Sequence, residues 1–204
     1  MTIKLELFYD VESSYSYLAF MCLDRYVPTI WPEVELVLRP ALLGGVFKAV
    51  GNVPPITLAA RAPYLINDMA KSAKYFGVPV QIPDGFPSAS LAVMRLLTAV
   101  ARDAPSTLRD VTRALYRRHW GDGLAVDTPE AWAACGAGAH ADKVSTQDVK
   151  DALKAATDEA VRRGAFGFPA MFIHKGGDDD MYFGSDRIPL LAHDLGLPYR
   201  GPNP

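Results

Sequence analysis

The sequence IKLELFYDVESSYS, residues 3–16, combines the pattern of a β-strand with the start of a helix. Apolar and polar residues alternate at first, and the segment then becomes fully apolar up to Asp10, as in a strand that enters a hydrophobic core. Beyond this loop, apolar residues recur at steps of three and four. This spacing predicts a helix that begins near residues 13–16 and ends before Pro28.

A second strand and a block of helices follow. Residues 34–39, VELVLR, predict a strand that ends at Pro40, and the strand–helix–strand spacing favours a parallel pair joined by a right-handed crossover. Helical periodicity then recurs in four segments separated by stretches rich in proline and glycine: residues 59–76, 90–103, 106–120 and 146–163.

The C-terminal part predicts a hairpin and a final helix. We expect strands at residues 170–174 and 181–183, a turn at residues 175–180, and a helix over residues 188–195 ended by Gly196. This order predicts an α/β fold whose core is interrupted by an all-α inserted domain. The expected boundaries are residues 1–58 and 164–204 for the core and residues 59–163 for the inserted helical domain.

Composition excludes several classes of function. The 204 residues include 21 Lys and Arg against 23 Asp and Glu, and no large basic cluster occurs, so we expect no binding to nucleic acid or to a membrane surface. The two cysteines are far apart and the four histidines have no ligand spacing, which argues against a disulfide framework and a metal site. No stretch resembles a signal peptide or a membrane span. We expect a soluble intracellular protein in the cytoplasm, with an organelle left open.

The first candidate site is the loop that contains Ser13. Its hydroxyls lie at the start of a predicted helix, where free N–H groups and the positive end of the dipole attract an anion such as a thiolate or carboxylate. Ser13 and Ser16 occupy the outer positions at which redox proteins of this topology have the cysteines of a CxxC pair, so a dithiol cycle is excluded here. The structural alternative is that Ser13 or Ser14 is an N-cap.

Two further candidates lie near the C-terminus. Pro169 precedes a predicted strand; if its peptide bond is cis, the backbone of Phe168 can pair with an extended peptide, and otherwise the proline simply marks the start of the strand. Ser185 and Asp186 precede the last helix. They could bind the carboxylate and the ammonium of an amino acid, or could serve only as an N-cap and a partner of the helix dipole.

The connection over residues 39–55 is predicted to be long and irregular, which is typical of functional or mobile loops. Asn52 and Arg61 are the candidate ligands of this region.

Together, these motifs resemble the kappa-class glutathione transferases over residues 5–202. In the N-terminal part, the resemblance rests on FYDV (residues 8–11) with Ser13 and YS (15–16), and on RP (39–40) followed by GN (51–52) and PP (54–55). In the C-terminal part, it rests on GAFG (164–167) with Pro169, and on FGSDR (183–187) followed by LLAH (190–193) and LG (195–196). It implies a thioredoxin-like fold with an inserted helical domain, a homodimer, and glutathione bound in a cleft between the domains.

The resemblance also implies roles for single residues. Ser13 matches the catalytic serine that hydrogen-bonds the glutathione sulfur, and Ser185 with Asp186 matches the pair that holds the γ-glutamyl group. The other implied glutathione-binding residues are Ser14, Tyr15, Asn52, Arg61, Phe168 and Pro169. Ser14 replaces the usual proline, and Arg61 replaces a lysine, which keeps the charge but changes its geometry.

The expected reaction is attack of the bound thiolate on a small hydrophobic electrophile such as an aryl halide or, in a glutathione peroxidase activity, a hydroperoxide. Glutathione is then a co-substrate and no metal takes part. The thiolate is the nucleophile, and a serine hydroxyl can stabilise it by donating a hydrogen bond. Two alternatives remain open: a glutathione-dependent 2-hydroxychromene-2-carboxylate isomerase, and a non-catalytic protein that binds glutathione or another thiol peptide.

Overall fold

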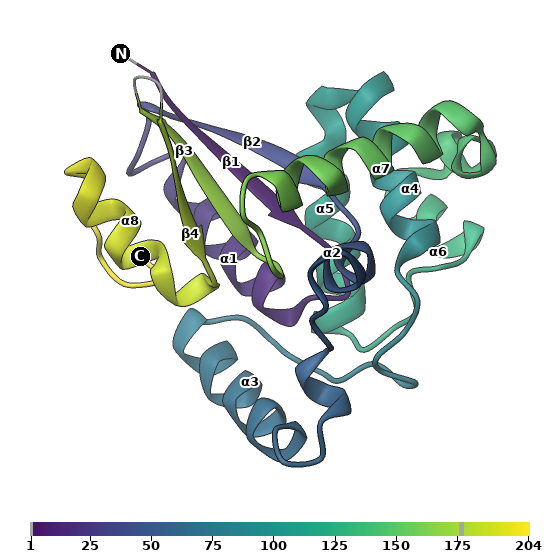
Figure 1. The fold of residues 1–204 in the computed structure, drawn as a ribbon, viewed down its shortest axis with the longest axis horizontal. Helices are drawn as coiled ribbons and strands as arrows, with labels where there is room; N and C mark the ends of the chain where they lie inside the picture. Colours follow the sequence, from purple (N-terminus) through teal and green to yellow (C-terminus); the bar gives the residue numbers. More distant parts are fainter. Residues whose placement is uncertain (1, 176–177) are drawn as a thin grey trace.

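A four-stranded mixed sheet forms the centre of the molecule. The computed structural model describes residues 2–175 and 178–204. The strands are β1 (Ile3–Tyr9), β2 (Val34–Pro40), β3 (Ala170–Lys175) and β4 (Asp178–Phe183), in the order β2-β1-β3-β4 (Figure 1). The pair β1–β2 is parallel, and β3 is antiparallel to both β1 and β4. The predicted parallel pair and hairpin are confirmed, and the centre of the predicted turn, residues 176–177, lies outside the described residues.

Helices cover both faces of the sheet. The side chains of Leu5, Leu7 and Tyr9 in β1 belong to a large core with α1 (Ser14–Tyr26) and α8 (Ile188–Leu195). Phe8 and its neighbours on the opposite face pack against a smaller core formed with α2 (Leu43–Val50) and α7 (Gln147–Arg162). The predicted first helix is therefore confirmed. So is the last one, which ends at Gly196 with φ 67°.

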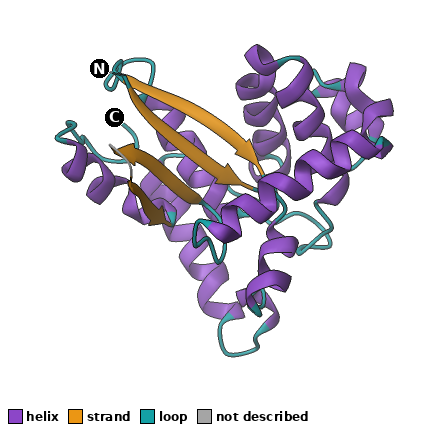
Figure 2. Cartoon of the chain, turned by 45° about the horizontal axis from the view of Figure 1, so that its top comes forward, coloured by secondary structure: helices purple, strands orange, loops and turns teal. Residues whose placement is uncertain are grey.

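The chain between β2 and β3 is largely helical (Figure 2). Its α-helices are α2 (Leu43–Val50), α3 (Ala62–Phe76), α4 (Leu91–Asp103), α5 (Leu108–Tyr116), α6 (Pro129–Ala134) and α7 (Gln147–Arg162). A π-helical turn, Arg117–Gly121, directly follows α5. Short 3-10 segments occur at Pro55–Thr57, Pro105–Thr107, Gly138–Ser145 and Ser185–Arg187. The four predicted helical segments are confirmed, and α2 and α6 are additional.

The expectation of an irregular connection over residues 39–55 is wrong, because α2 lies within it. This helix contains two glycines, which have a low helix propensity, so propensity alone does not predict it. Packing explains one of them: a Cβ at Gly45 would lie only 2.9 Å from Cγ2 of Thr157 in α7, so the absence of a side chain lets the two helices approach. Tertiary contact thus outweighs the low helix propensity of glycine.

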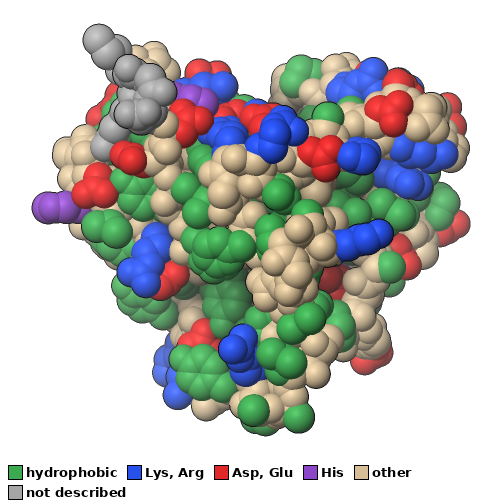
Figure 3. All heavy atoms as spheres, viewed as in Figure 1, with side chains coloured by type: hydrophobic (Ala, Val, Ile, Leu, Met, Phe, Trp, Pro, Cys, Tyr) green, Lys and Arg blue, Asp and Glu red, His purple; other side chains and the backbone are tan. Residues whose placement is uncertain are grey.

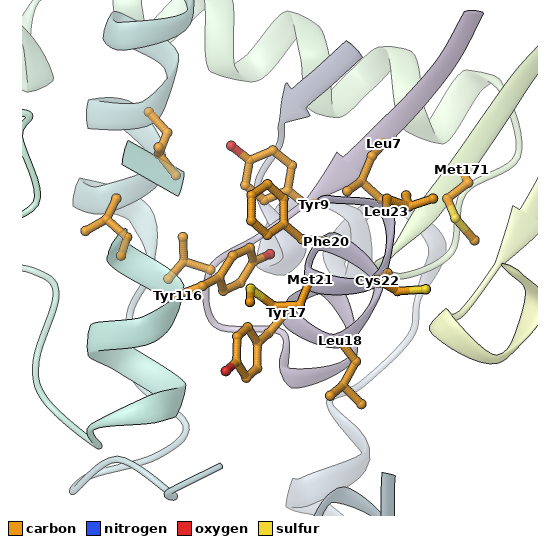
Figure 4. Packing of buried hydrophobic residues seen from close by; sticks show 14 of the residues in the cluster. Leu7, Tyr9, Tyr17, Leu18, Phe20, Met21, Cys22, Leu23, Tyr116 and Met171 are labelled. Atoms are coloured by element: carbon orange, nitrogen blue, oxygen red, sulfur yellow. The ribbon is translucent and has the colours of Figure 1, made fainter. Parts of the chain in front are cut away.

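An aromatic cluster attaches the helical insertion to the core (Figure 4). The ring of Tyr116, at the end of α5, lies with its centroid 5.4–6.0 Å from those of Tyr9, Tyr17 and Phe20. Aromatic pairs at these separations add to the stabilisation from burial alone. Cys22 in α1 is fully buried.

Asp10 joins three segments around the end of β1. Its fully buried carboxylate accepts hydrogen bonds from the N–H groups of Glu12 (3.0 Å) and Leu43 (2.8 Å) and from the hydroxyl of Ser90 (2.9 Å). Burial raises the pKa of Asp10 to about 6, although these three hydrogen bonds act to lower it. Because Leu43 begins α2 and Ser90 precedes α4, this carboxylate connects the core to the insertion.

Glu6 is a second buried carboxylate, on the face of the sheet opposite α1. Arg163 (2.7 Å), His174 (2.7 Å) and Arg39 surround it. Burial alone would raise the pKa of Glu6, but the contacts with these groups outweigh burial and lower it to about 2. The Glu6 side chain is therefore ionised at neutral pH. No helix in the described part of the chain combines the length and apolar character needed to cross a membrane.

Asp10 should make stability depend on pH. Its pKa of about 6 lies above the ordinary value, so the folded state binds more protons than the unfolded state between about pH 4 and pH 6. The free energy of unfolding should therefore fall by about 1 kcal/mol from pH 5 to pH 7 through this group. Urea unfolding of the wild type and of Asp10→Asn at both pH values measures the difference. An equal slope in the variant would contradict the assignment.

Candidate active site

Ser13 caps the N-terminus of α1, as one of the sequence-based readings predicts. Its backbone is extended (φ −85°, ψ 110°), and its Oγ accepts the N–H of Ser16 at 3.1 Å. The same hydroxyl donates to the backbone carbonyl of Phe168 at 3.0 Å. Ser13 is therefore held between the start of α1 and a segment 155 residues further along the chain, with only 8% of its surface exposed.

Phe168 and Pro169 form the segment that Ser13 contacts. The peptide bond between them is cis, the condition under which the sequence predicts a peptide-binding backbone here. The Pro169 carbonyl accepts the N–H of Gly184 at 3.0 Å, which brings the end of β4 alongside. The segment thus lies between α1 and the residues that precede α8.

Ser185 and Asp186 lie in a 3-10 turn (Ser185–Arg187) directly before α8. The reading of Ser185 as the N-cap of the last helix is wrong, because Arg187 occupies that position and makes no side-chain cap hydrogen bond. Ser185 is buried, whereas the side chain of Asp186 is 71% exposed. Gly184 has φ 97°, and a Cβ there would lie 2.5 Å from the Asp186 carboxylate, so only glycine fits this turn.

These segments border one cavity of about 470 Å³. Five predicted site residues line it: Tyr15, Phe168, Pro169, Ser185 and Asp186. The remaining lining residues are Tyr64, Asp68, Ser72, Tyr75, Phe76, Phe183, Gly184, Pro189 and Tyr199. The cavity is lined by aromatic rings together with two carboxylates. Such a site suits an extended ligand that carries an ammonium group.

Ser13, Ser14, Asn52 and Arg61 are not among the residues that line this cavity. Ser13 lies at the edge of the cavity, because its hydroxyl donates to the carbonyl of the lining residue Phe168. The amide of Asn52 donates to the carbonyl of Phe166 at 3.1 Å, so Asn52 lies beside the segment that leads to Phe168. Arg61 is exposed at the start of α3, and the structure does not bring it to the cavity lining.

Helix α3 contributes residues that the sequence reasoning missed. Tyr64, Asp68, Ser72 and Tyr75 follow one another at helical steps and line the cavity from one face of α3. The hydroxyl of Tyr15 donates to Asp68 Oδ2 at 2.5 Å, which ties α3 to α1. Burial and the contact with Asp68 raise the pKa of Tyr15. The spacing of these four residues is the signal that could have found them.

The C-terminal segment supplies Tyr199, for which the sequence offers no signal. Arg25 at the end of α1 holds this segment, because its guanidinium donates to the carbonyl of Pro202 (3.0 Å) and to that of Phe76 at the end of α3 (2.6 Å). Tyr199 also stacks on Tyr26, with ring centroids 5.6 Å apart. One arginine therefore fixes two walls of the cavity.

The chemistry available here is the binding and stabilisation of an anion. Ser13 offers a hydroxyl beside the positive end of α1, and a sulfur or oxygen anion at this position would be stabilised by both. Neither Cys22 nor Cys135 supplies such an anion, since both are buried free thiols. Within residues 2–175 and 178–204, no group of three or more His, Cys, Asp or Glu side chains is placed to hold a metal ion.

Comparison with known proteins agrees with this description. Residues 4–196 match the family model of the DSBA-like thioredoxin domain. The chain is 40% identical over 213 residues to glutathione S-transferase kappa 1 of Homo sapiens, covering 98% of this chain and 93% of that protein. It is 25% identical over 201 residues to 2-hydroxychromene-2-carboxylate isomerase of Pseudomonas putida, covering 94% and 93%.

A solved structure of 2-hydroxychromene-2-carboxylate isomerase has the same fold, with a TM-score of 0.81 at 23% identity over 95% of this chain and 94% of that one. The predicted thioredoxin-like core with a helical insertion is thereby confirmed. The identity to the human transferase over nearly the whole chain is much higher than the identity to either isomerase. The chain therefore belongs to the kappa-class glutathione S-transferases, within the family of DSBA-like thioredoxin domains.

Proposed function

We propose that this protein is a glutathione S-transferase that binds glutathione in the cavity of about 470 Å³ and presents its sulfur as a thiolate to Ser13. One observation carries the proposal: the Ser13 hydroxyl lies at the N-terminus of α1 and donates to the carbonyl of Phe168, at the edge of that cavity. The cysteinyl part of an extended tripeptide that pairs with this carbonyl has its sulfur next to Ser13.

An exchange of hydrogen bonds would place the thiolate. The Ser13 hydroxyl has one O–H, so it must leave the Phe168 carbonyl to donate to sulfur, and the cysteinyl N–H of glutathione would then take its place on that carbonyl. A free thiol has a pKa near 8.5, and lowering it by about 2 units requires about 2.7 kcal/mol. A charge-assisted hydrogen bond contributes about 1.5–3 kcal/mol and the helix dipole about 0.3–1 kcal/mol, which together are sufficient.

The γ-glutamyl end of glutathione is proposed to bind at the other end of the cavity. Asp186 would accept hydrogen bonds from its ammonium group, and the Ser185 hydroxyl would donate to its carboxylate, as the resemblance implies. Asp68 lines the same cavity and offers a second carboxylate. Ser14, Asn52 and Arg61 stay in the proposal on the resemblance alone, because none of them lines the cavity.

The second substrate is proposed to be a small hydrophobic electrophile, and the assembly a homodimer. Tyr64 and Tyr75 of α3 are 71% and 63% exposed, and exposed apolar side chains grouped on one helix are typical of a surface that contacts another subunit. Figure 3 shows hydrophobic side chains in the lower part of the molecule in this view, where α3 lies. A reducing compartment such as the cytoplasm is proposed because both cysteines are free thiols.

The isomerase relative supports a second candidate activity. Its substrate is a carboxylate by name, so the two activities can be separated by kinetics. The purified protein should be supplied with glutathione and an aryl halide and, separately, with glutathione and 2-hydroxychromene-2-carboxylate. A higher kcat/KM for the aryl halide supports the transferase, and the reverse supports the isomerase. Binding of glutathione without either turnover would support a non-catalytic binding protein.

Replacing Ser13 by alanine should reduce turnover without unfolding the protein. The loss of the hydrogen bond to sulfur should lower kcat for a model aryl halide at least about tenfold, which corresponds to about 1.4 kcal/mol of transition-state stabilisation. Steady-state kinetics measures the change, and circular dichroism checks the fold. Ser106→Ala, at an exposed position of a 3-10 segment, is the matched control. Unchanged turnover in Ser13→Ala would exclude Ser13 as the partner of the thiolate.

Replacing Asp186 by asparagine should weaken glutathione binding. The ammonium contact is the same in the ground state and the transition state, so KM for glutathione should rise at least about fivefold while kcat changes little. The matched control is Asp151→Asn, an exposed position in α7. An unaltered KM would mean that Asp186 serves only the helix end.

A further inference from the structure

The loop that leads from β1 to Ser13 is held by the helical insertion. Trp120 Nε1 donates to the carbonyl of Val11 at 2.8 Å, and the N–H of Val11 lies 3.4 Å from the sulfur of Met94. The hydroxyl of Tyr116 donates to the carbonyl of Asp10 at 3.2 Å. Met94, Tyr116 and Trp120 all belong to the insertion, so it determines where the loop that carries Ser13 is placed.

Glu12, the residue directly before Ser13, makes the ionisable contact of this loop. Its carboxylate accepts the hydroxyl of Ser88 at 2.8 Å, and its Oε2 lies 3.0 Å from Nε2 of His119. The two side chains are only 11% and 3% exposed, respectively. Because little solvent surrounds this pair, its charges are weakly screened and interact electrostatically with neighbouring groups.

Both ring nitrogens of His119 face oxygen acceptors. Nε2 faces the Glu12 carboxylate, and Nδ1 lies 3.3 Å from the carbonyl of Leu124. A neutral imidazole has one N–H group and can satisfy only one of these contacts, whereas the imidazolium has two. The arrangement therefore fits a positively charged His119 paired with a negatively charged Glu12.

The surroundings of the pair favour the same charge on His119. The two side chains line a cavity of about 180 Å³ that is separate from the glutathione cavity. Asp84 and Asp127 also line it, and the buried carboxylate of Asp10 lies close enough to interact with Glu12. No Lys or Arg is among its lining residues, so His119 is the one lining residue there that can carry a positive charge.

His119 lies in the π-helical turn Arg117–Gly121. Consecutive residues of this turn contact consecutive residues of the loop, because His119 meets Glu12 and Trp120 meets Val11. Single π-helical turns within helices are frequent at functional sites. Here the turn places the side chain of Trp120 on the backbone carbonyl of Val11 and the side chain of His119 on the carboxylate of Glu12. Both contacts lie directly before Ser13.

We propose that His119 is a positioning residue of the reaction: as the counter-charge of Glu12, it prevents that carboxylate from destabilising the glutathione thiolate at Ser13. This inference rests on the proposed function. Glu12 and Ser13 are consecutive residues, with Cα atoms about 3.8 Å apart, and the Glu12 carboxylate is largely buried, so its charge is weakly screened from a sulfur bound at Ser13. An unpaired negative charge nearby disfavours a second one.

The test is a pH titration of the ultraviolet thiolate absorbance of bound glutathione. His119→Gln keeps an N–H for Glu12 but removes the positive charge. The pKa of the bound thiol should rise by about one unit, and kcat at neutral pH should fall about fivefold. KM for glutathione should stay within about twofold, because binding contacts are untouched. The double variant Glu12→Gln/His119→Gln should bring the thiol pKa back to near the wild-type value, since both charges are then absent.

His140→Gln is the matched control, because His140 is a second largely buried histidine of the insertion, beside Asp103. It should leave the thiol pKa unchanged. An unshifted thiol pKa in His119→Gln, with a lowered pKa in the wild type, would overturn this inference alone. A wild-type thiol pKa equal to that of free glutathione would overturn the proposed function as well. If His119→Gln does not fold, Glu12→Gln decides: the inference requires that its thiol pKa does not rise.

Discussion

The carboxylate of Asp10 is the interaction on which the site depends. It lies at the end of β1 and binds the first residue of α2, the residue before α4, and the loop that leads to Ser13. Burying a charge without partners costs several kcal/mol, so the three donors are required as much as the carboxylate is. The strand, the insertion and the Ser13 loop consequently have one fixed arrangement, and the position of the Ser13 hydroxyl follows from it.

Much of the fold could be predicted because it depends on local patterns. Alternation in β1, the three- and four-residue steps in α1 and the glycine after α8 each appear within one short segment. Helix α2 could not be predicted, because one of its two glycines, Gly45, is explained only by the approach of Thr157, more than a hundred residues away. Capping preference alone predicts Ser185 as the cap of the last helix, but a 3-10 turn, Ser185–Arg187, precedes α8 and places Arg187 at the cap position.

The candidate site was predictable where a motif lies in one stretch, as with Ser13, Phe168–Pro169 and Ser185–Asp186. It was not predictable where distant segments meet. Asp68 and Tyr75 reach the cavity because α3 folds against α1, and Tyr199 because Arg25 holds the C-terminal segment. The contact of His119 with Glu12 likewise depends on a π-helical turn, which a periodicity of 3.6 residues cannot show.

The insertion therefore has a role beyond enclosing a substrate. It fixes the loop before Ser13 through uncharged contacts and through one buried charge pair. The most direct test of the account is a crystal structure of the protein with glutathione bound. The sulfur should lie within hydrogen-bond distance of Ser13 Oγ, with the cysteinyl N–H donating to the Phe168 carbonyl in place of the Ser13 hydroxyl. A sulfur directed away from Ser13, with that hydroxyl still bonded to Phe168, would contradict it.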